Sequence, residues 1–152
     1  GTARALLEQA ASRGKDLLLD IDVQGARQVR ERVPEAVSIF ILPPNPQVLE
    51  GRLRERSRSE GALDPSIIRR RLDKARHEIE NYSQYSYILV NDVLEVAVAQ
   101  LLAIVTVERQ LRSHEPGEPE DLERYEAMAR NCRQFAARPA LAPVLASFGL
   151  GS

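Results

Sequence analysis

Three short apolar runs, separated by segments with a helical pattern, constrain the fold of this chain more than any other feature. They are DLLLDID at 16–22, VSIFIL at 37–42 and YSYILV at 85–90. An unbroken apolar run bounded by polar residues is typical of a strand that is buried on both faces. Strands that alternate with helices pair in parallel through right-handed crossovers. The sequence therefore predicts an α/β fold in which helices flank a parallel sheet.

Polar or turn residues stand at the carboxyl end of every run. Asp20 and Asp22 are two positions apart, so on a strand their carboxylates share one face. Pro43-Pro44 and Asn91-Asp92 end the other two runs. In open parallel sheets, ligands bind beyond the carboxyl ends of the strands. Two solvated turn carboxylates would give the same local pattern, but the shared edge favours a binding site.

Capping residues and helix breakers delimit the helices. Asn45-Pro46 and Asp64-Pro65 each place an N-cap residue before a proline at the first helical position. Asp92 and Glu95 have the spacing of a capping box, and Gly14 is a stop signal. The polar stretch 58–63 has no periodicity and predicts a mobile loop. The expected helices cover about residues 2–13 (with Thr2 as cap), 26–32, 46–57, 65–82 and 93–112.

Positive charge gathers around that loop. Residues 52–74 contain seven arginines and one lysine against four acidic residues, a net charge of +4. Guanidinium groups match phosphate oxygens in geometry, so residues 52–76 are expected to form a lid over an anionic ligand. A solvated pair of helices is the alternative. Arg71 favours the lid, because it lies at the edge of an apolar stripe, where a charge needs a partner.

Composition narrows the class of protein. The chain has 152 residues, 43% of them hydrophobic, which is enough for one core. Its single cysteine, Cys132, excludes an internal disulfide, and we expect it to be a buried small hydrophobe. His77 and His114 are too far apart in sequence to suggest a ligand pair. With 21 basic and 22 acidic residues, we expect no nucleic-acid or membrane partner. Without a basic-then-apolar leader, a cytoplasmic location is the expectation.

Five motifs occur here in a characteristic order. They are GT at the start, LLLDIDVQGA, VSIFILPP, LRERS followed by an arginine-bearing helix, and YSYILVND. The ordered set resembles bacterial guanylate kinase over roughly residues 1–112. This resemblance implies a P-loop-kinase-like α/β fold and a kinase that transfers a phosphoryl group from ATP to GMP with magnesium.

The resemblance also implies roles for residues near the phosphates. Arg56 and Arg71 match the lid arginines that bind phosphate groups. Phosphoryl transfer requires such positive charge next to the phosphoryl oxygens. Asp20 and Asp22 match two acids that lie between the nucleotides. Asp20 is nearer the magnesium and would hold the ion through water, whereas Asp22 is nearer GMP.

Two further matches concern the bases of the nucleotides. Thr2 resembles the hydroxyl residue that helps to recognise guanine. Asn91 matches the asparagine beside the adenine ring.

The chain also departs from the family pattern. The phosphate loop G-x-x-x-x-G-K-[ST] occurs nowhere, and Gly14-Lys15 is followed by Asp16. The arginines and tyrosines of the small GMP-binding region are missing. Ser57 stands where the family has glycine, and Val93 replaces a second acid. Because the first residue is Gly1, we expect the chain to be processed, tagged or cut from something longer. We interpret it as a C-terminal part of a guanylate kinase that lacks turnover alone.

Two other functions stay open at this point. One is a non-catalytic guanylate-kinase-like module that binds protein. The absent phosphate loop favours it, whereas the joint presence of the matched aspartates, lid arginines and asparagine disfavours it. The other is a related small-molecule kinase with a different phosphate acceptor.

The resemblance ends at Arg112. Residues 113–119 are rich in proline, glycine and charge and predict a linker, and residues 120–152 predict a helical extension. In that extension, an apolar stripe at helical spacing should pack on the body of the protein, and it also allows self-association through the C-terminal helix. The stripe consists of Leu122, Tyr125, Met128, Ala129, Cys132 and Phe135.

Overall fold

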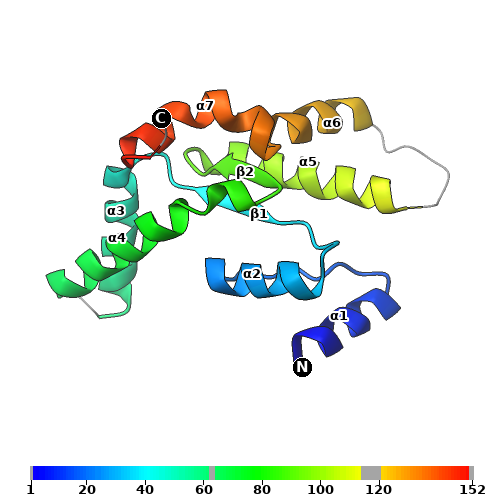
Figure 1. The fold of residues 1–152 in the computed structure, drawn as a ribbon, viewed down its shortest axis with the longest axis horizontal. Helices are drawn as coiled ribbons and strands as arrows, with labels where there is room; N and C mark the ends of the chain where they lie inside the picture. Colours follow the sequence, from blue (N-terminus) through cyan, green and yellow to red (C-terminus); the bar gives the residue numbers. More distant parts are fainter. Residues whose placement is uncertain (1, 62–63, 114–120, 151–152) are drawn as a thin grey trace. The chain divides into compact units, whose positions relative to one another are not determined.

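The computed structural model describes residues 2–61, 64–113 and 121–150, with side chains from residue 4 onward. The chain divides into two compact units, Gly1–Pro34 and Glu35–Ser152. The first unit holds the helices α1 (Thr2–Ser12) and α2 (Val23–Arg32). The second unit (Figure 1) holds β1 (Ile39–Leu42), α3 (Pro46–Ser59), α4 (Pro65–Ile79), the 3-10 turn η1 (Tyr82–Gln84), β2 (Tyr87–Val90), α5 (Leu94–Arg112), α6 (Leu122–Asn131) and α7 (Gln134–Ser147).

The two strands pair in parallel, as the sequence predicts. Ile39 is opposite Tyr87, and the register continues to Leu42 opposite Val90. Because side chains alternate along a strand, each strand contributes to two separate cores. The parallel sheet flanked by helices is therefore confirmed for the second unit.

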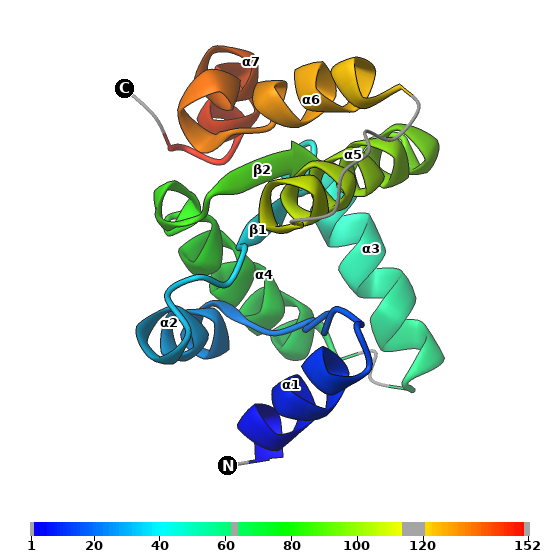
Figure 2. The same ribbon diagram turned by 90° about the vertical axis from the view of Figure 1, so that its right-hand side faces the viewer.

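One core packs on the face of the sheet that carries Leu42 and Ile88, and it includes Ile79 at the end of α4 and several residues of α7. The other packs on the face that carries Tyr87 and Leu89, beneath α5 and α6. Figures 1 and 2 show α6 beside α5 and α7 beside β2, which agrees with their contacts. Burial on both faces explains why the two runs are continuously apolar.

The expected first strand, at residues 16–22, is not a strand in the structure. Residues 15–22 have no regular secondary structure, and the described sheet has two strands rather than three. Leu18 and Ile21 are 80% and 44% exposed. A strand needs a neighbouring backbone to take up its hydrogen bonds, and this segment has none within the sheet that the structure describes. Its apolar composition alone was therefore insufficient for the prediction.

The helix boundaries of the first unit follow local chemistry. Gly14 has φ +64°, and the N–H groups of Gly14 and Lys15 bond to carbonyls of the last turn of α1. That left-handed ending confirms the predicted stop signal. Helix α2 begins at Val23, three residues before the predicted start, because the Asp22 carboxylate accepts a 2.8 Å hydrogen bond from the Gly25 N–H. Asp22 therefore has a structural role as an N-cap.

Helices α3 and α4 form a hairpin whose starts match the prediction. The Asn45 side chain accepts from the Val48 N–H, and the Asp64 carboxylate accepts from the Ser66 N–H at 2.9 Å. This backbone hydrogen bond is the main reason that the pKa of Asp64 lies below its usual value. The predicted loop begins later than expected, because Arg58 and Ser59 are still helical. Positions 62 and 63 of that loop lie outside the described residues.

The start of helix α5 differs from the predicted capping box. Its N-cap is Val93, which makes no side-chain capping bond, so the pattern of Asp92 and Glu95 does not act as a capping box. The helix ends at Arg112, as expected.

No described helix combines the length and the apolar character needed to cross a bilayer.

The C-terminal helices are part of the core of the second unit. Leu141 and Leu145 of α7 are 3% and 4% exposed, and Cys132 at the end of α6 is 3% exposed. Burial raises the pKa of the Cys132 thiol, as expected for a small buried hydrophobe. Phe135 contradicts the predicted stripe, because it is 72% exposed. Residues 114–120, which include most of the predicted linker at 113–119, lie outside the described residues, so the linker stays a prediction.

Hydrogen bonds and charge fasten this extension to β2. The Ile88 N–H donates to the Cys132 carbonyl at 2.8 Å, and Tyr87 and Arg133 form an antiparallel bridge. The Tyr87 hydroxyl donates to Glu108 of α5 at 2.6 Å, and the Arg133 guanidinium lies 4.6 Å from the centre of the Tyr87 ring. Burial, and then the hydrogen bond to Glu108, raise the pKa of Tyr87 to about 12.

A pair of neighbouring substitutions tests the core assignment. Leu42→Ala should lower the free energy of unfolding by about 2–5 kcal/mol, because it leaves a cavity. Ile41→Ala, at a side chain that is 52% exposed, should cost less than half as much. Urea unfolding of both variants measures the difference. Equal losses would contradict the assignment of Leu42 to the core.

The pKa of Tyr87 predicts a loss of stability at alkaline pH. Between pH 10 and about 12, the phenol ionises in the unfolded chain but stays neutral in the folded one. Unfolding is therefore favoured as the pH rises through this range. In urea unfolding at several pH values, Tyr87→Phe should show a shallower decline in the free energy of unfolding than the wild type. Parallel plots of the free energy of unfolding against pH for the wild type and Tyr87→Phe would show that folding does not hinder ionisation of the Tyr87 hydroxyl.

Candidate functional site

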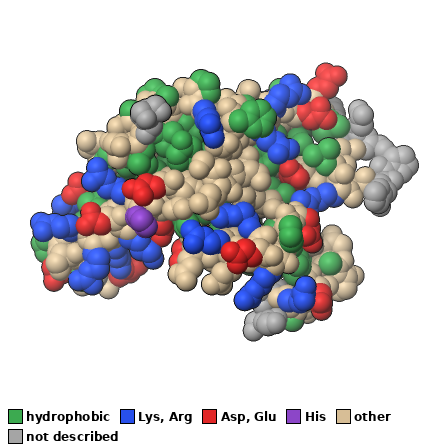
Figure 3. All heavy atoms as spheres, in the orientation of Figure 1, with side chains coloured by type: hydrophobic (Ala, Val, Ile, Leu, Met, Phe, Trp, Pro, Cys, Tyr) green, Lys and Arg blue, Asp and Glu red, His purple; other side chains and the backbone are tan. Residues whose placement is uncertain are grey.

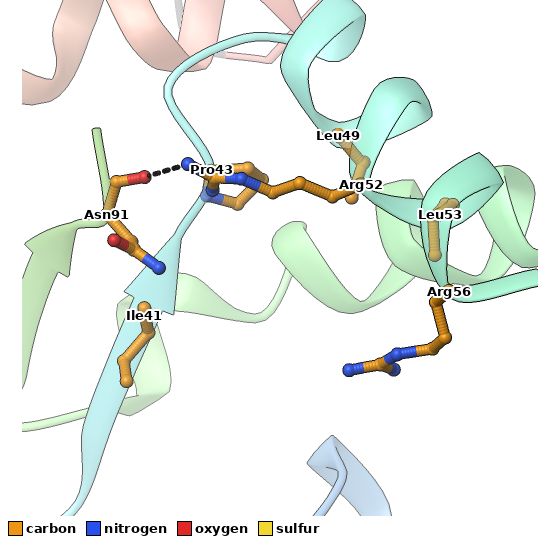
Figure 4. A pocket seen from close by; sticks show the side chains of 7 residues that line it. All are labelled: Ile41, Pro43, Leu49, Arg52, Leu53, Arg56 and Asn91. Atoms are coloured by element: carbon orange, nitrogen blue, oxygen red, sulfur yellow. Dashed lines mark hydrogen bonds between the residues drawn. The ribbon is translucent and has the colours of Figure 1, made fainter. Parts of the chain in front are cut away.

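Two strand ends and one helix meet at the carboxyl edge of the sheet. The Asn91 N–H donates to the Leu42 carbonyl at 2.9 Å, which extends the parallel pairing by one residue. The Arg52 guanidinium of α3 donates to the Asn91 carbonyl at 2.8 Å (Figure 4). These two bonds hold the end of β2 against β1 and against α3.

A hollow of about 250 Å³ lies at this junction. Figure 4 shows Ile41 and Pro43 from the β1 side, Asn91 from the end of β2, and four side chains from α3. The Asn91 side-chain amide has no hydrogen-bond partner among the described residues, so its donors and its acceptor are available. The lining consists of Ile41, Pro43, Leu49, Arg52, Leu53, Arg56 and Asn91.

Helix α3 presents this lining because of its start and its periodicity. The Asn45 cap and Pro46 set the first turn immediately after the strand end. Leu49, Leu53 and Arg56 then follow at intervals of four and three, which places them on one face of the helix. Apolar walls with a few polar groups suit a ligand that has a flat, partly apolar body and an anionic end.

Arg56 contributes a second cation to this lining, beside Arg52. It is exposed, and it forms no ion pair with any residue that the structure describes. A second hollow of about 440 Å³ also has Arg52 and Arg56 in its lining. Other cations of the hairpin are paired along their own helix, namely Arg54 with Glu50, Arg58 with Glu55, and Lys74 with Glu78. Figure 3 shows this mixture of basic and acidic side chains over α3 and α4.

Arg71 of α4 reaches back to the end of α3. Its Nη1 donates to the Ser57 hydroxyl at 3.1 Å, and its Nη2 lies 2.8 Å from a Glu60 carboxylate oxygen. Ser57 is fully buried, so the bond from Arg71 satisfies a polar group that water does not reach. The expectation that Arg71 needs a partner is confirmed. The bond brings Arg71 to the turn of α3 that carries Arg56.

The remaining predicted residues belong to the first unit. Asp20 is exposed and has no ion pair with a described residue, whereas Asp22 caps α2. The side chain of Thr2 lies outside the described part of the chain. Among the described residues, no group of three or more His, Cys, Asp or Glu side chains is placed to hold a metal ion. The structure thus brings Arg56 and Asn91 to one hollow and places Arg71 against the end of α3 in the same unit, whereas the aspartates belong to the other unit.

Sequence reasoning missed three polar residues of this region, namely Arg52, Ser57 and Glu60. Arg52 could have been recognised, because it stands four residues before Arg56 and therefore on the same helix face. Ser57 and Glu60 carry no local signal, since their partner Arg71 is 14 and 11 residues away.

Comparison with known proteins gives one consistent result. The family model for guanylate kinase matches residues 1–108. The guanylate kinase of Koribacter versatilis is 55% identical over 113 residues, which are 74% of this chain and 48% of that protein. A guanylate kinase of Thermus thermophilus is 52% identical over 118 residues, or 78% and 51% of the two chains. That of Vibrio cholerae is 45% identical over 109 residues, or 72% and 51%.

The chain spans about half the length of the curated relatives that it matches. The match covers the strands, the hairpin and most of α5, and it therefore includes every residue of the hollow at the sheet edge. The chain belongs to the guanylate kinase family.

Proposed function

We propose that this chain forms the part of a guanylate kinase that contacts ATP and the transferred phosphoryl group, in an enzyme that phosphorylates GMP to GDP. The observation that carries the proposal is the convergence of Arg56 and Asn91 on one hollow within the matched region. The family resemblance assigns each of these residues to nucleotide binding. A pure scaffold has no physical need for this combination of a cation and an available amide.

The proposed roles follow from the chemistry of the side chains. The Asn91 amide lies beside an apolar wall that includes Ile41 and Leu53, where an adenine ring would find both packing and a hydrogen-bonding edge. Arg56, without an ion-pair partner in the described chain, is available to bind phosphate oxygens. Arg71 would supply a second guanidinium fork. Phosphoryl transfer depends mainly on such positioning and on positive charge at the equatorial oxygens.

The first unit would contribute the residues near GMP and magnesium. The Asp20 carboxylate is exposed, and a single carboxylate is a common protein ligand for magnesium that keeps several of its waters. Magnesium would neutralise phosphate charge when bound. We propose Asp22 and Thr2 as contacts on the GMP side. A cytoplasmic location belongs to the same proposal, as does self-association through the C-terminal helix.

The proposed function needs a phosphate loop from residues outside these 152, which contain no G-x-x-x-x-G-K-[ST] sequence. Backbone amides of such a loop hold the ATP phosphates in P-loop kinases. The proposal therefore assigns binding and positioning roles to this chain and a complete active site to a longer protein.

A chimera tests the proposed function. The residues of the Thermus thermophilus guanylate kinase that precede its matched region are joined to the start of this chain. We expect GMP-dependent ATP consumption from the chimera and none from the 152-residue chain in a coupled assay. An inactive but folded chimera, or robust turnover by the chain alone, would contradict the proposal.

Within the chimera, Arg71→Ala should lower kcat on the order of 100-fold, because it removes charge that stabilises the transition state. The KM for GMP should change much less. Arg69→Ala removes an exposed arginine from the same helix and is the matched control, with kcat expected within about twofold of the wild type. Equal kcat for the two variants would show that Arg71 has no special role.

A further inference from the structure

The ion pair between Arg71 and Glu60 differs from the other pairs of the α3–α4 hairpin. The pairs of Arg54, Arg58 and Lys74 each join residues three or four positions apart in one helix. Arg71 and Glu60 are 11 positions apart and connect α4 to the residue that follows α3. Within the described part of the hairpin, it is the one ion pair that joins its two arms.

The two ends of the Arg71 guanidinium meet different chemistry. Nη1 donates to the buried hydroxyl of Ser57, a neutral acceptor fixed within helix α3. Nη2 donates to the Glu60 carboxylate, an anionic acceptor at the surface. A carboxylate and a phosphate present similar pairs of oxygens to a guanidinium fork. Glu60 therefore occupies the kind of position that a phosphate oxygen would take.

The exposure of the pair indicates how firmly it holds. The side chains of Arg71 and Glu60 are 34% and 48% exposed. An ion pair of this exposure is weak, because water screens it and two long side chains lose freedom in forming it. A phosphate group carries more charge than one carboxylate and can displace it. The Ser57 hydroxyl can keep its hydrogen bond during such an exchange, because it binds the other end of the guanidinium.

We propose that Glu60 is a positioning residue. Its carboxylate binds the Arg71 guanidinium while no phosphate is present, and a nucleotide phosphate displaces it on binding. This inference rests on the proposed function, since it takes Arg71 as a phosphate contact. It adds a competing group, Glu60, and a fixed anchor, Ser57. Glu60 keeps the guanidinium directed to the end of α3 and lowers its affinity for anions.

The competition predicts a gain of binding when Glu60 loses its charge. Inorganic tripolyphosphate is the probe, and the Arg71 Nε–H resonance of the 152-residue chain is followed by NMR at low ionic strength. Arg71→Lys identifies the resonance. Glu60→Gln should tighten binding at Arg71 by about two- to fivefold, the size expected for a partly exposed pair. Glu60→Asp keeps the negative charge and should bind less tightly than Glu60→Gln.

Glu55→Gln is the matched control. It removes the same charge from the same arm of the hairpin, but Glu55 pairs with Arg58 and not with Arg71. Its effect on binding at Arg71 should be less than half that of Glu60→Gln. Equal gains in the two variants, or weaker binding in Glu60→Gln, would overturn the inference alone. No response of Arg71 to tripolyphosphate in any variant would overturn both the inference and the proposed role of Arg71.

Discussion

The parallel pairing of Ile39–Leu42 with Tyr87–Val90 is the constraint on which the rest of the second unit depends. It gives two adjacent strands a common carboxyl edge, so Asn91 lies beside the end of β1 although 49 positions separate it from Leu42. The same pairing divides the strand side chains between two cores. The chain beyond the family match, in α6 and α7, then covers both cores and bonds to the outer edge of β2. Residues that pack on both faces of the sheet therefore hold in place the carboxyl edge at which the hollow lies.

The arginines of the α3–α4 hairpin differ in the groups that they contact. Arg52 is engaged by the Asn91 carbonyl and supports the junction, whereas Arg56 has no ion-pair partner in the described chain. Arg71 is held by one neutral and one anionic group. The three arginines of the hairpin thus differ in how readily they can bind a phosphate. The net charge of residues 52–74 does not reveal this difference, because the difference depends on which acceptor each side chain reaches.

Two cap-and-proline signals predicted helix starts well, whereas the capping box expected at Asp92 and Glu95 did not form. Asn45-Pro46 and Asp64-Pro65 begin helices as expected, because capping needs only residues within one turn. The segment at 16–22 failed as a strand because pairing requires a distant partner, which an apolar run does not specify. Phe135 failed for a related reason: α6 ends at Asn131 and α7 begins at Gln134, so the helical spacing does not continue across the break. For the site, Arg56, Arg71 and Asn91 came from family resemblance, while the partners of Arg71 required the folded chain.

We propose that the carboxyl edge of β1 and β2, together with α3, forms a nucleotide site. An NMR titration of the 152-residue chain with ADP tests it most directly, because weak binding is visible residue by residue. We predict that shifts concentrate at Ile41, Arg52, Arg56 and Asn91, with a matching loss of affinity in Asn91→Ala. Shifts concentrated instead on the basic helix α2, at Arg27 and Arg32, with none at Asn91, would show that the nucleotide does not bind at this edge.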